Sequence, residues 1–199
     1  MQKLLIATNN AGKVREFQEL LKGLPYTLVT PKESGIKLEV EETGITYQEN
    51  ARIKAAAFVK ASGLLTLADD SGLEVDALNG EPGIRSSRYA GEGAGDKERV
   101  DFLLNKLKNV PEKLRKGRFR CVIALARPDG RIDFCEGVCE GRINFTPRGS
   151  EGFGYDPIFY FTELNQTMAE LPSEVKNQIS HRARAAAKAR LLLQDWASR

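Results

Sequence analysis

The protein has 199 residues, of which 41% are hydrophobic and 29% are charged, an ordinary globular balance that predicts one domain spanning residues 1–199. No run approaches the roughly 20 apolar residues of a membrane span, and the N-terminus lacks a secretory signal, so we expect a cytoplasmic protein without a membrane partner. The formal charge of +3 is too small to indicate a stable nucleic-acid partner. The three cysteines contain no Cys-x-x-Cys pair and are expected to be reduced, on strands.

The first third of the chain predicts strands that alternate with helices. Lys3–Ala7 is a short apolar run typical of a buried strand, and the amphipathic stretch Val14–Leu21 after it predicts a helix. A second strand is expected over Thr27–Val29. The capping box Thr46-Tyr47-Gln48-Glu49 then opens an alanine-rich helix that ends at Gly63.

The rest of the chain predicts more strands, followed by helices. Leu64–Ala68 is another buried strand, which we expect to end in the polar sequence Asp69-Asp70-Ser71-Gly72. Asn79–Gly95 is a long glycine-containing loop. Further strands are expected over Arg118–Arg127, Arg131–Cys139, Glu140–Pro147 and Ile158–Phe161, and helices over Asp96–Leu107, from Pro172, and over His181–Trp196. This order predicts an α/β fold with a mixed β-sheet, in which ligands bind at the carboxyl ends of strands.

The first candidate for chemistry lies between the first strand and the first helix. It reads Thr8, Asn9, Asn10, Ala11, Gly12, Lys13. A helix N-terminus attracts anions, Gly12 would let the backbone approach a phosphate, and Lys13 would add positive charge. The segment is not a Walker motif, and a polar turn with an Asn cap is the alternative.

The second candidate is the carboxylate pair Asp69 and Asp70. Neighbouring residues of a strand point to opposite faces, so only one of the two is expected to face the site. Magnesium takes one or two protein carboxylates, with waters and phosphate oxygens, and Glu41 or Glu42 could supply the partner. An Asp turn before a glycine is the alternative.

Two further segments contain residues suited to a flat, anionic ligand. Gly152-Phe153-Gly154-Tyr155-Asp156-Pro157 places glycines around two aromatic rings, so Phe153 could stack on a base, although an ordinary aromatic loop has the same composition. Ser180-His181-Arg182 opens a helix and offers hydrogen-bond donors near Lys176. A lone histidine without a Gly-x-Ser-x-Gly sequence gives no support to a catalytic triad.

Together these segments resemble the inosine/xanthosine triphosphate pyrophosphatase family, the dITP/XTP pyrophosphatases. The matching segments follow the family's order along essentially the whole chain. They are Thr8–Lys13, Glu41–Gly44, Glu49–Ala51, Asp69–Leu73, Pro82–Ile84, Ser87–Tyr89, Phe153–Phe159 and Ile179–Arg182. Asp-Asp-Ser-Gly-Leu together with Phe-Gly-Tyr-Asp-Pro-Ile-Phe is a specific combination.

The resemblance implies a homodimer whose subunits have two lobes around a long mixed sheet, flanked by helices, with a cleft between them. It implies magnesium-dependent hydrolysis of ITP, dITP and XTP to the monophosphate and pyrophosphate. By the same resemblance Glu42 and Asp70 hold Mg2+, and Asp70 is also the proton acceptor. The implied substrate-binding residues are Thr8, Asn9, Asn10, Ala11, Gly12, Lys13, Lys54, Ser71, Phe153, Gly154, Tyr155, Asp156, Lys176, His181 and Arg182.

Two other functions stay open from the residues alone. A nucleotide- or RNA-binding protein without turnover could use the basic C-terminal helix and Phe153. The paired acidic motifs argue against it, because they would repel a polyanion in the absence of a cation. An α/β domain without any site is the remaining possibility.

Overall fold

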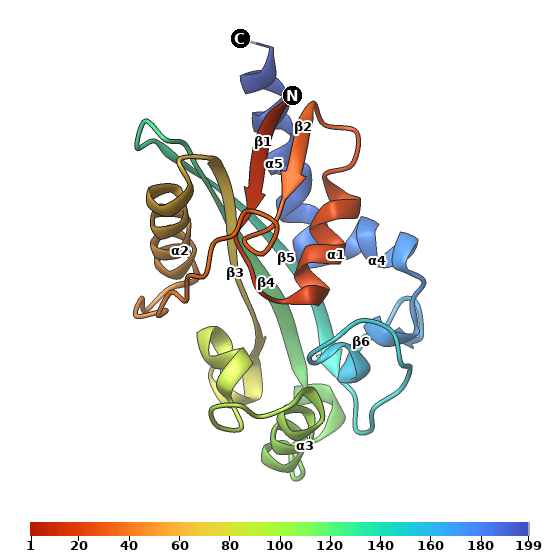
Figure 1. The fold of residues 1–199 in the computed structure, drawn as a ribbon. Helices are drawn as coiled ribbons and strands as arrows, with labels where there is room; N and C mark the ends of the chain where they lie inside the picture. The colour runs from red at the N-terminus through yellow and green to blue at the C-terminus, as the bar shows by residue number, and fades with distance from the viewer. Residues whose placement is uncertain (199) are drawn as a thin grey trace. The chain divides into compact units, whose positions relative to one another are not determined.

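A computed structural model describes residues 1–198 of the protein (Figure 1). Its seven-stranded sheet has the order β2-β1-β3-β4-β5-β6-β7. The strands are β1 (Gln2–Ile6), β2 (Tyr26–Val29), β3 (Leu65–Val75), β4 (Lys116–Ala126), β5 (Ile132–Ile143), β6 (Phe159–Phe161) and β7 (Gln166–Thr167). The helices are α1 (Ala11–Leu20), α2 (Tyr47–Ser62), α3 (Asp96–Lys106), α4 (Ser173–Ile179) and α5 (His181–Ala197). β1 is parallel to β2 and β3, whereas β6 is antiparallel to β5 and β7, which confirms the α/β fold with a mixed sheet.

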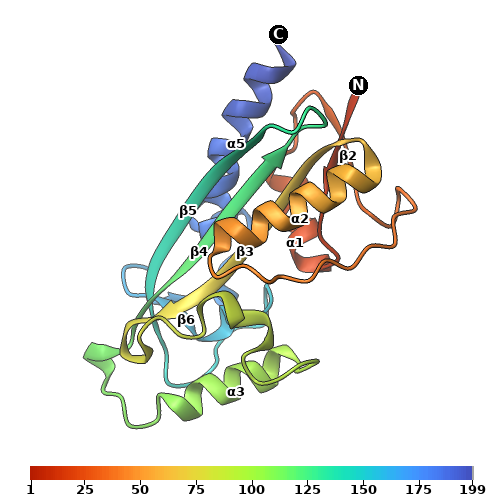
Figure 2. The same cartoon turned by 90° about the vertical axis from the view of Figure 1, so that its left-hand side faces the viewer.

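The chain forms two compact units, each with its own apolar core. Unit 1 contains Met1–Asp70, Cys121–Gly137 and the chain from His181 onward. Its core joins residues of β1, α1, β3 and α5, among them Ile6, Phe17, Leu67 and Ala186. Figures 1 and 2 show α2 on one side of the strands of unit 1, and α1 and α5 on the other. Unit 1 is therefore a sheet covered by helices on both faces.

Unit 2 contains Ser71–Arg120 and Val138–Ser180. Its core contains a cluster of aromatic rings. The ring centroid of Phe159 lies 4.6 Å from that of Phe119 and 5.4 Å from that of Phe161. The helix α3 contributes Leu103 to this core, and the guanidinium of Arg115 donates to the carbonyl oxygens of Leu107 and Ile143.

The local signals of the sequence place most elements correctly. The Thr46 hydroxyl caps α2 by accepting from the Glu49 backbone N–H, and Gly63 ends this helix in the left-handed region at φ 66°. The three cysteines are free and buried on β4 and β5, which confirms the prediction of reduced thiols on strands. Among residues 1–198, every helix is too short or too polar to cross a bilayer.

Several predicted boundaries are wrong. The polar sequence Asp69–Gly72 does not end a strand, because β3 continues through it to Val75. Glu140 begins no separate strand, since β5 runs unbroken to Ile143. The helix α1 begins at Ala11 rather than Val14, and the long loop Asn79–Gly95 contains the 3-10 helix Gly83–Arg88.

Candidate functional site

The first candidate segment lies where β1 passes into α1, within unit 1. Asn10 is the N-cap of α1, and its side-chain oxygen accepts from the Lys13 backbone N–H at 3.0 Å. The Thr8 hydroxyl accepts from the Asn10 backbone N–H at 3.2 Å. Gly12 therefore sits in the first turn of a ten-residue helix. The segment presents a helix N-terminus and the positive charge of Lys13, the combination that binds anions.

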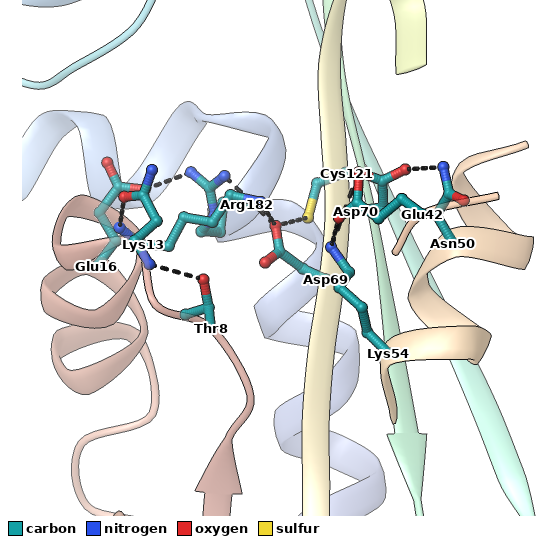
Figure 3. A network of polar contacts seen from close by, with 11 residues as sticks. Thr8, Lys13, Glu16, Glu42, Asn50, Lys54, Asp69, Asp70, Cys121 and Arg182 are labelled. Carbon is teal, nitrogen blue, oxygen red and sulfur yellow. Dashed lines mark hydrogen bonds and ion pairs between the residues drawn. The ribbon is translucent and has the colours of Figure 1, made fainter. Parts of the chain in front are cut away.

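The carboxylate of Asp69 is buried on the α1 and α5 side of β3, as Figure 3 shows. The backbone register explains why Lys13 lies near Asp69. β1 pairs with Leu65–Leu67 of β3 and ends at Ile6, just before the loop that leads to Lys13. Lys13 Nζ lies 2.9 Å from Asp69 Oδ2, and Arg182 from the start of α5 lies 3.5 Å from the same oxygen.

The ion pairs of Asp69 with Lys13 and Arg182 stabilise its negative charge. Burial alone would raise the pKa of its carboxyl group, but the charges of Lys13 and Arg182 hold that pKa well below its usual range. Arg182 is 2% exposed and also pairs with Glu16 of α1, at 2.5 Å. Cys121 Sγ lies 3.9 Å from Asp69 Oδ2, and burial raises the pKa of this thiol. Asp69 is therefore a buried carboxylate whose charge is stabilised by two cations.

Asp70 points to the opposite side of β3, towards α2 (Figure 3). Asn50 Nδ2 donates to Asp70 Oδ2 at 3.0 Å, and Lys54 Nζ lies 4.0 Å from Asp70 Oδ1. Lys54 Nζ also pairs with Glu42 Oε1 at 2.5 Å. The lysine therefore links the two carboxylates that the sequence analysis assigned to metal binding.

The pKa of Asp70 is shifted in the direction opposite to that of Asp69. Burial raises the pKa of Asp70, Lys54 lowers it and Glu42 raises it, and the net change is upward. Burial alone would lower the pKa of Lys54, but three neighbouring carboxylates raise it above its usual value. A carboxylate with a raised pKa is better able to accept a proton near neutral pH.

The donor set around Asp70 fits magnesium rather than a softer metal. Glu42 and Asp70 supply carboxylate oxygens, the ligands that magnesium prefers, and magnesium needs only one or two of them when phosphate oxygens and waters complete its shell. Within residues 1–198 there is no group of three or more His, Cys, Asp or Glu side chains able to hold a metal ion.

The remaining predicted residues belong partly to unit 2. Lys176 Nζ pairs with Asp156 Oδ2 at 2.6 Å and lies 5.0 Å from the centre of the Phe153 ring. Tyr155 is buried, and its hydroxyl donates to the Ser86 carbonyl oxygen, so its ring forms part of the core. The Gly154 backbone N–H donates to Asp96 at 2.7 Å.

The structure thus groups the predicted residues into two sets. Unit 1 brings together Lys13, Glu42, Lys54, Asp70 and Arg182 around β3, and His181 begins the helix that carries Arg182. Unit 2 brings together the loop Phe153–Asp156 and Lys176, and Ser71 is its first residue.

Sequence reasoning missed three residues of the unit 1 networks, namely Glu16, Asn50 and Asp69 as an ion-pair partner. Helical spacing could have found two of them. Glu16 follows Lys13 by three positions, and Asn50 precedes Lys54 by four, so each shares a helix face with a predicted residue. For Asp69, strand alternation predicts on which face of the sheet the side chain lies, but not that Lys13 and Arg182 lie on that face.

The comparisons with known proteins all match this chain over nearly its full length. A family model described as the Ham1 family matches residues 4–191. The dITP/XTP pyrophosphatase of Desulforamulus reducens is 53% identical over 191 residues, covering 96% of this chain and 95% of the relative. The enzyme of the same name from Geobacter sulfurreducens is 49% identical, covering 94% of each. The solved structure of a HAM1 protein from Coxiella burnetii has a TM-score of 0.88 at 43% identity, covering 98% of this chain and 100% of that one.

Proposed function

The chain belongs to the Ham1 family, and from that premise we propose that it hydrolyses deaminated purine nucleoside triphosphates to the monophosphate and pyrophosphate. The observation that carries the proposal is the pair of opposed networks on β3, with a cationic helix start on one side and the Glu42–Lys54–Asp70 group on the other. Phosphoryl transfer needs both features, namely charge to hold the phosphates and carboxylates to hold a metal.

The triphosphate is assigned to the segment Thr8–Lys13 and to Lys54. The N-terminus of α1 offers backbone N–H groups, and Lys13 adds a cation whose geometry Asp69 fixes at 2.9 Å. Lys54 lies among the carboxylates of the metal site, so it would neutralise charge where phosphate and metal meet.

We assign Mg2+ as the cofactor, held by Glu42 and Asp70. When bound, the ion would supply Lewis-acid polarisation of the phosphate oxygens and neutralise their charge. Residues of the chain bind the phosphates and accept the proton. Water attacks the α-phosphorus, the bond to the bridging oxygen breaks, and pyrophosphate leaves. The proton of the water passes to the Asp70 carboxylate, which acts as the general base.

The nucleoside is assigned to Phe153, Gly154, Tyr155, Asp156 and Lys176, with Ser71, His181 and Arg182. Hypoxanthine and xanthine carry an oxygen at C6 where adenine carries an amine, so a hydrogen-bond donor there would select for them. A buried donor left unpaired costs about 1–3 kcal/mol, enough for a preference of one to two orders of magnitude. Arg182 or a backbone N–H of the Phe153 loop would be that donor.

We also propose the domain organisation, the compartment and the oligomeric state of the protein. We assign the two units to one functional domain, because the family model spans both. The free cysteines fit a reducing compartment such as the cytoplasm. A homodimer is proposed from the resemblance, and a size measurement in solution tests it. The small net charge and the lack of long apolar runs argue against a nucleic-acid or membrane partner.

The decisive experiment measures pyrophosphate release from ITP, dITP and XTP, with ATP and GTP as controls, with and without magnesium. We expect pyrophosphate and monophosphate as products, a strong preference for the three deaminated nucleotides, and no turnover after chelation. Release of inorganic phosphate alone, or binding of ITP without turnover, would contradict the proposal. The second result would favour a nucleotide-binding protein instead.

A further inference from the structure

We propose that Asn50 is a positioning residue that fixes the carboxylate of Asp70 and the backbone of the Glu42 loop in one arrangement for metal binding. The proposal rests on the function proposed above, since it concerns the same metal site. Asn50 is fully buried, on α2, and its amide lies between the strand that carries Asp70 and the loop that carries Glu42.

The two hydrogen bonds of Asn50 use both ends of its amide. Asn50 Oδ1 accepts from the Gly44 backbone N–H at 2.8 Å, and Asn50 Nδ2 donates to Asp70 Oδ2 at 3.0 Å. A backbone N–H only donates and a carboxylate only accepts, so the two partners define which way the amide points. The arrangement requires an amide, because a carboxylate in its place could not donate to Asp70.

The Gly44 backbone is fitted closely against this amide. A Cβ atom at Gly44 would lie 2.7 Å from Asn50 Oδ1 and 2.6 Å from Glu49 Cβ, so no larger residue fits without a shift. Glu49 Oε2 also accepts from the Ile45 backbone N–H at 2.7 Å. The start of α2 therefore holds the backbone N–H groups of Gly44 and Ile45, two and three residues after Glu42.

The spacing along α2 completes the argument. Asn50 and Lys54 are four residues apart on one helix face, and both contact Asp70. Lys54 is a cation that would compete with the metal for the carboxylates of Glu42 and Asp70, whereas Asn50 is neutral and can keep its contacts when a metal binds. Asn50 therefore orients Asp70, and it need not touch substrate or metal itself.

The main test compares Asn50→Ala with the wild-type protein in two assays. The first is Mn2+ binding to the protein without nucleotide, followed by electron paramagnetic resonance, and the second is ITP turnover with magnesium. Partners that orient metal ligands typically contribute 10–100-fold to metal affinity or activity, so we expect Mn2+ affinity to fall at least tenfold. We expect kcat for ITP to fall by a similar factor and KM to change less than threefold, since Thr8–Lys13 is untouched.

Two controls separate positioning from stability and charge. Ala55→Gly removes a buried methyl group from the same helix without touching Asp70, and should lower the melting temperature while leaving Mn2+ affinity unchanged. Asn50→Asp keeps the acceptor for Gly44 and loses the donor to Asp70, and it is informative even if Asn50→Ala does not fold. Gln48→Glu makes the same amide-to-carboxylate change at an exposed position of α2.

We expect Asn50→Asp to lose at least tenfold in kcat and Gln48→Glu to stay within twofold of wild type. A folded Asn50→Ala with Mn2+ affinity and kcat within twofold of wild type would overturn the inference. So would an Asn50→Asp variant with more than half of the wild-type kcat. A wild-type protein that binds Mn2+ but does not hydrolyse ITP would instead refute the proposed function and leave the metal-binding comparison valid.

Discussion

Replacing Asp69 by Asn should destabilise the protein strongly at neutral pH. The amide is nearly isosteric but removes the charge that Lys13 meets at 2.9 Å and Arg182 at 3.5 Å. Breaking a buried ion pair by removing one partner costs about 3–5 kcal/mol. Lys13 is partly exposed and can turn to water, and Arg182 retains Glu16, so we expect the lower end, about 3 kcal/mol.

The loss of stability caused by Asp69→Asn should also depend on pH, and it should become smaller as pH falls. The pKa of Asp69 is lower in the folded protein than in the unfolded chain. Its contribution to stability is therefore complete above the ordinary pKa of about 3.9 and is lost as pH falls through the folded value. At pH 3 the difference between wild type and Asp69→Asn should have narrowed by about 1 kcal/mol, because the unfolded chain has by then bound the proton.

The assay is urea unfolding of both proteins at pH 7, 5 and 3. Asp133→Asn is the matched control, because Asp133 also pairs with an arginine of unit 1, at 2.9 Å, but is 40% exposed. An exposed pair contributes about 0–1 kcal/mol. If Asp69→Asn costs no more than Asp133→Asn at pH 7, the buried network does not stabilise the fold. A difference that stays constant down to pH 3 would refute the charge-based explanation.

Three further replacements test the proposed roles. Asp70→Asn should keep the fold and lower kcat by about 10²–10³, and a third of wild-type activity would exclude a central role. Lys13→Ala should raise the KM for ITP by about tenfold or more, since its charge faces the phosphates before and during reaction, and an unchanged KM would place it outside the site. Arg182→Ala should lower the ratio of kcat/KM for ITP over ATP by about tenfold to a hundredfold. An equal loss for both substrates would show that Arg182 acts only through Glu16 and Asp69.

The sequence predicted well where local interactions decide the structure. Both ends of α2 followed from its own residues, because the cap at Thr46 and the left-handed glycine at Gly63 are local devices. The parallel pairing of β1 with β2 across α1 agrees with the predicted alternation of strands and helices. These signals need no knowledge of distant contacts.

The course of β3 could not be predicted in the same way. Two aspartates, a serine and a glycine ordinarily indicate a turn, yet here they continue a buried strand. The strand tolerates Asp69 because cations from α1 and α5 neutralise it, and it tolerates Asp70 because α2 supplies an amide and a lysine. Arg182 lies more than a hundred residues further along the chain, so its burial beside Asp69 is not visible in any local pattern.

The structure places the two adjacent carboxylates in different environments. Strand alternation sends them to opposite faces, and the two environments move their pKa values in opposite directions. Two cations hold the pKa of Asp69 below its usual range, and its carboxylate fixes the side chains of Lys13 and Arg182. Asp70 meets one shared lysine and the carboxylate of Glu42, so it is the one with a raised pKa and the one that gains from a bound cation. Under the proposed mechanism Asp70 is therefore the proton acceptor, and the positions of the Lys13 and Arg182 side chains depend on Asp69.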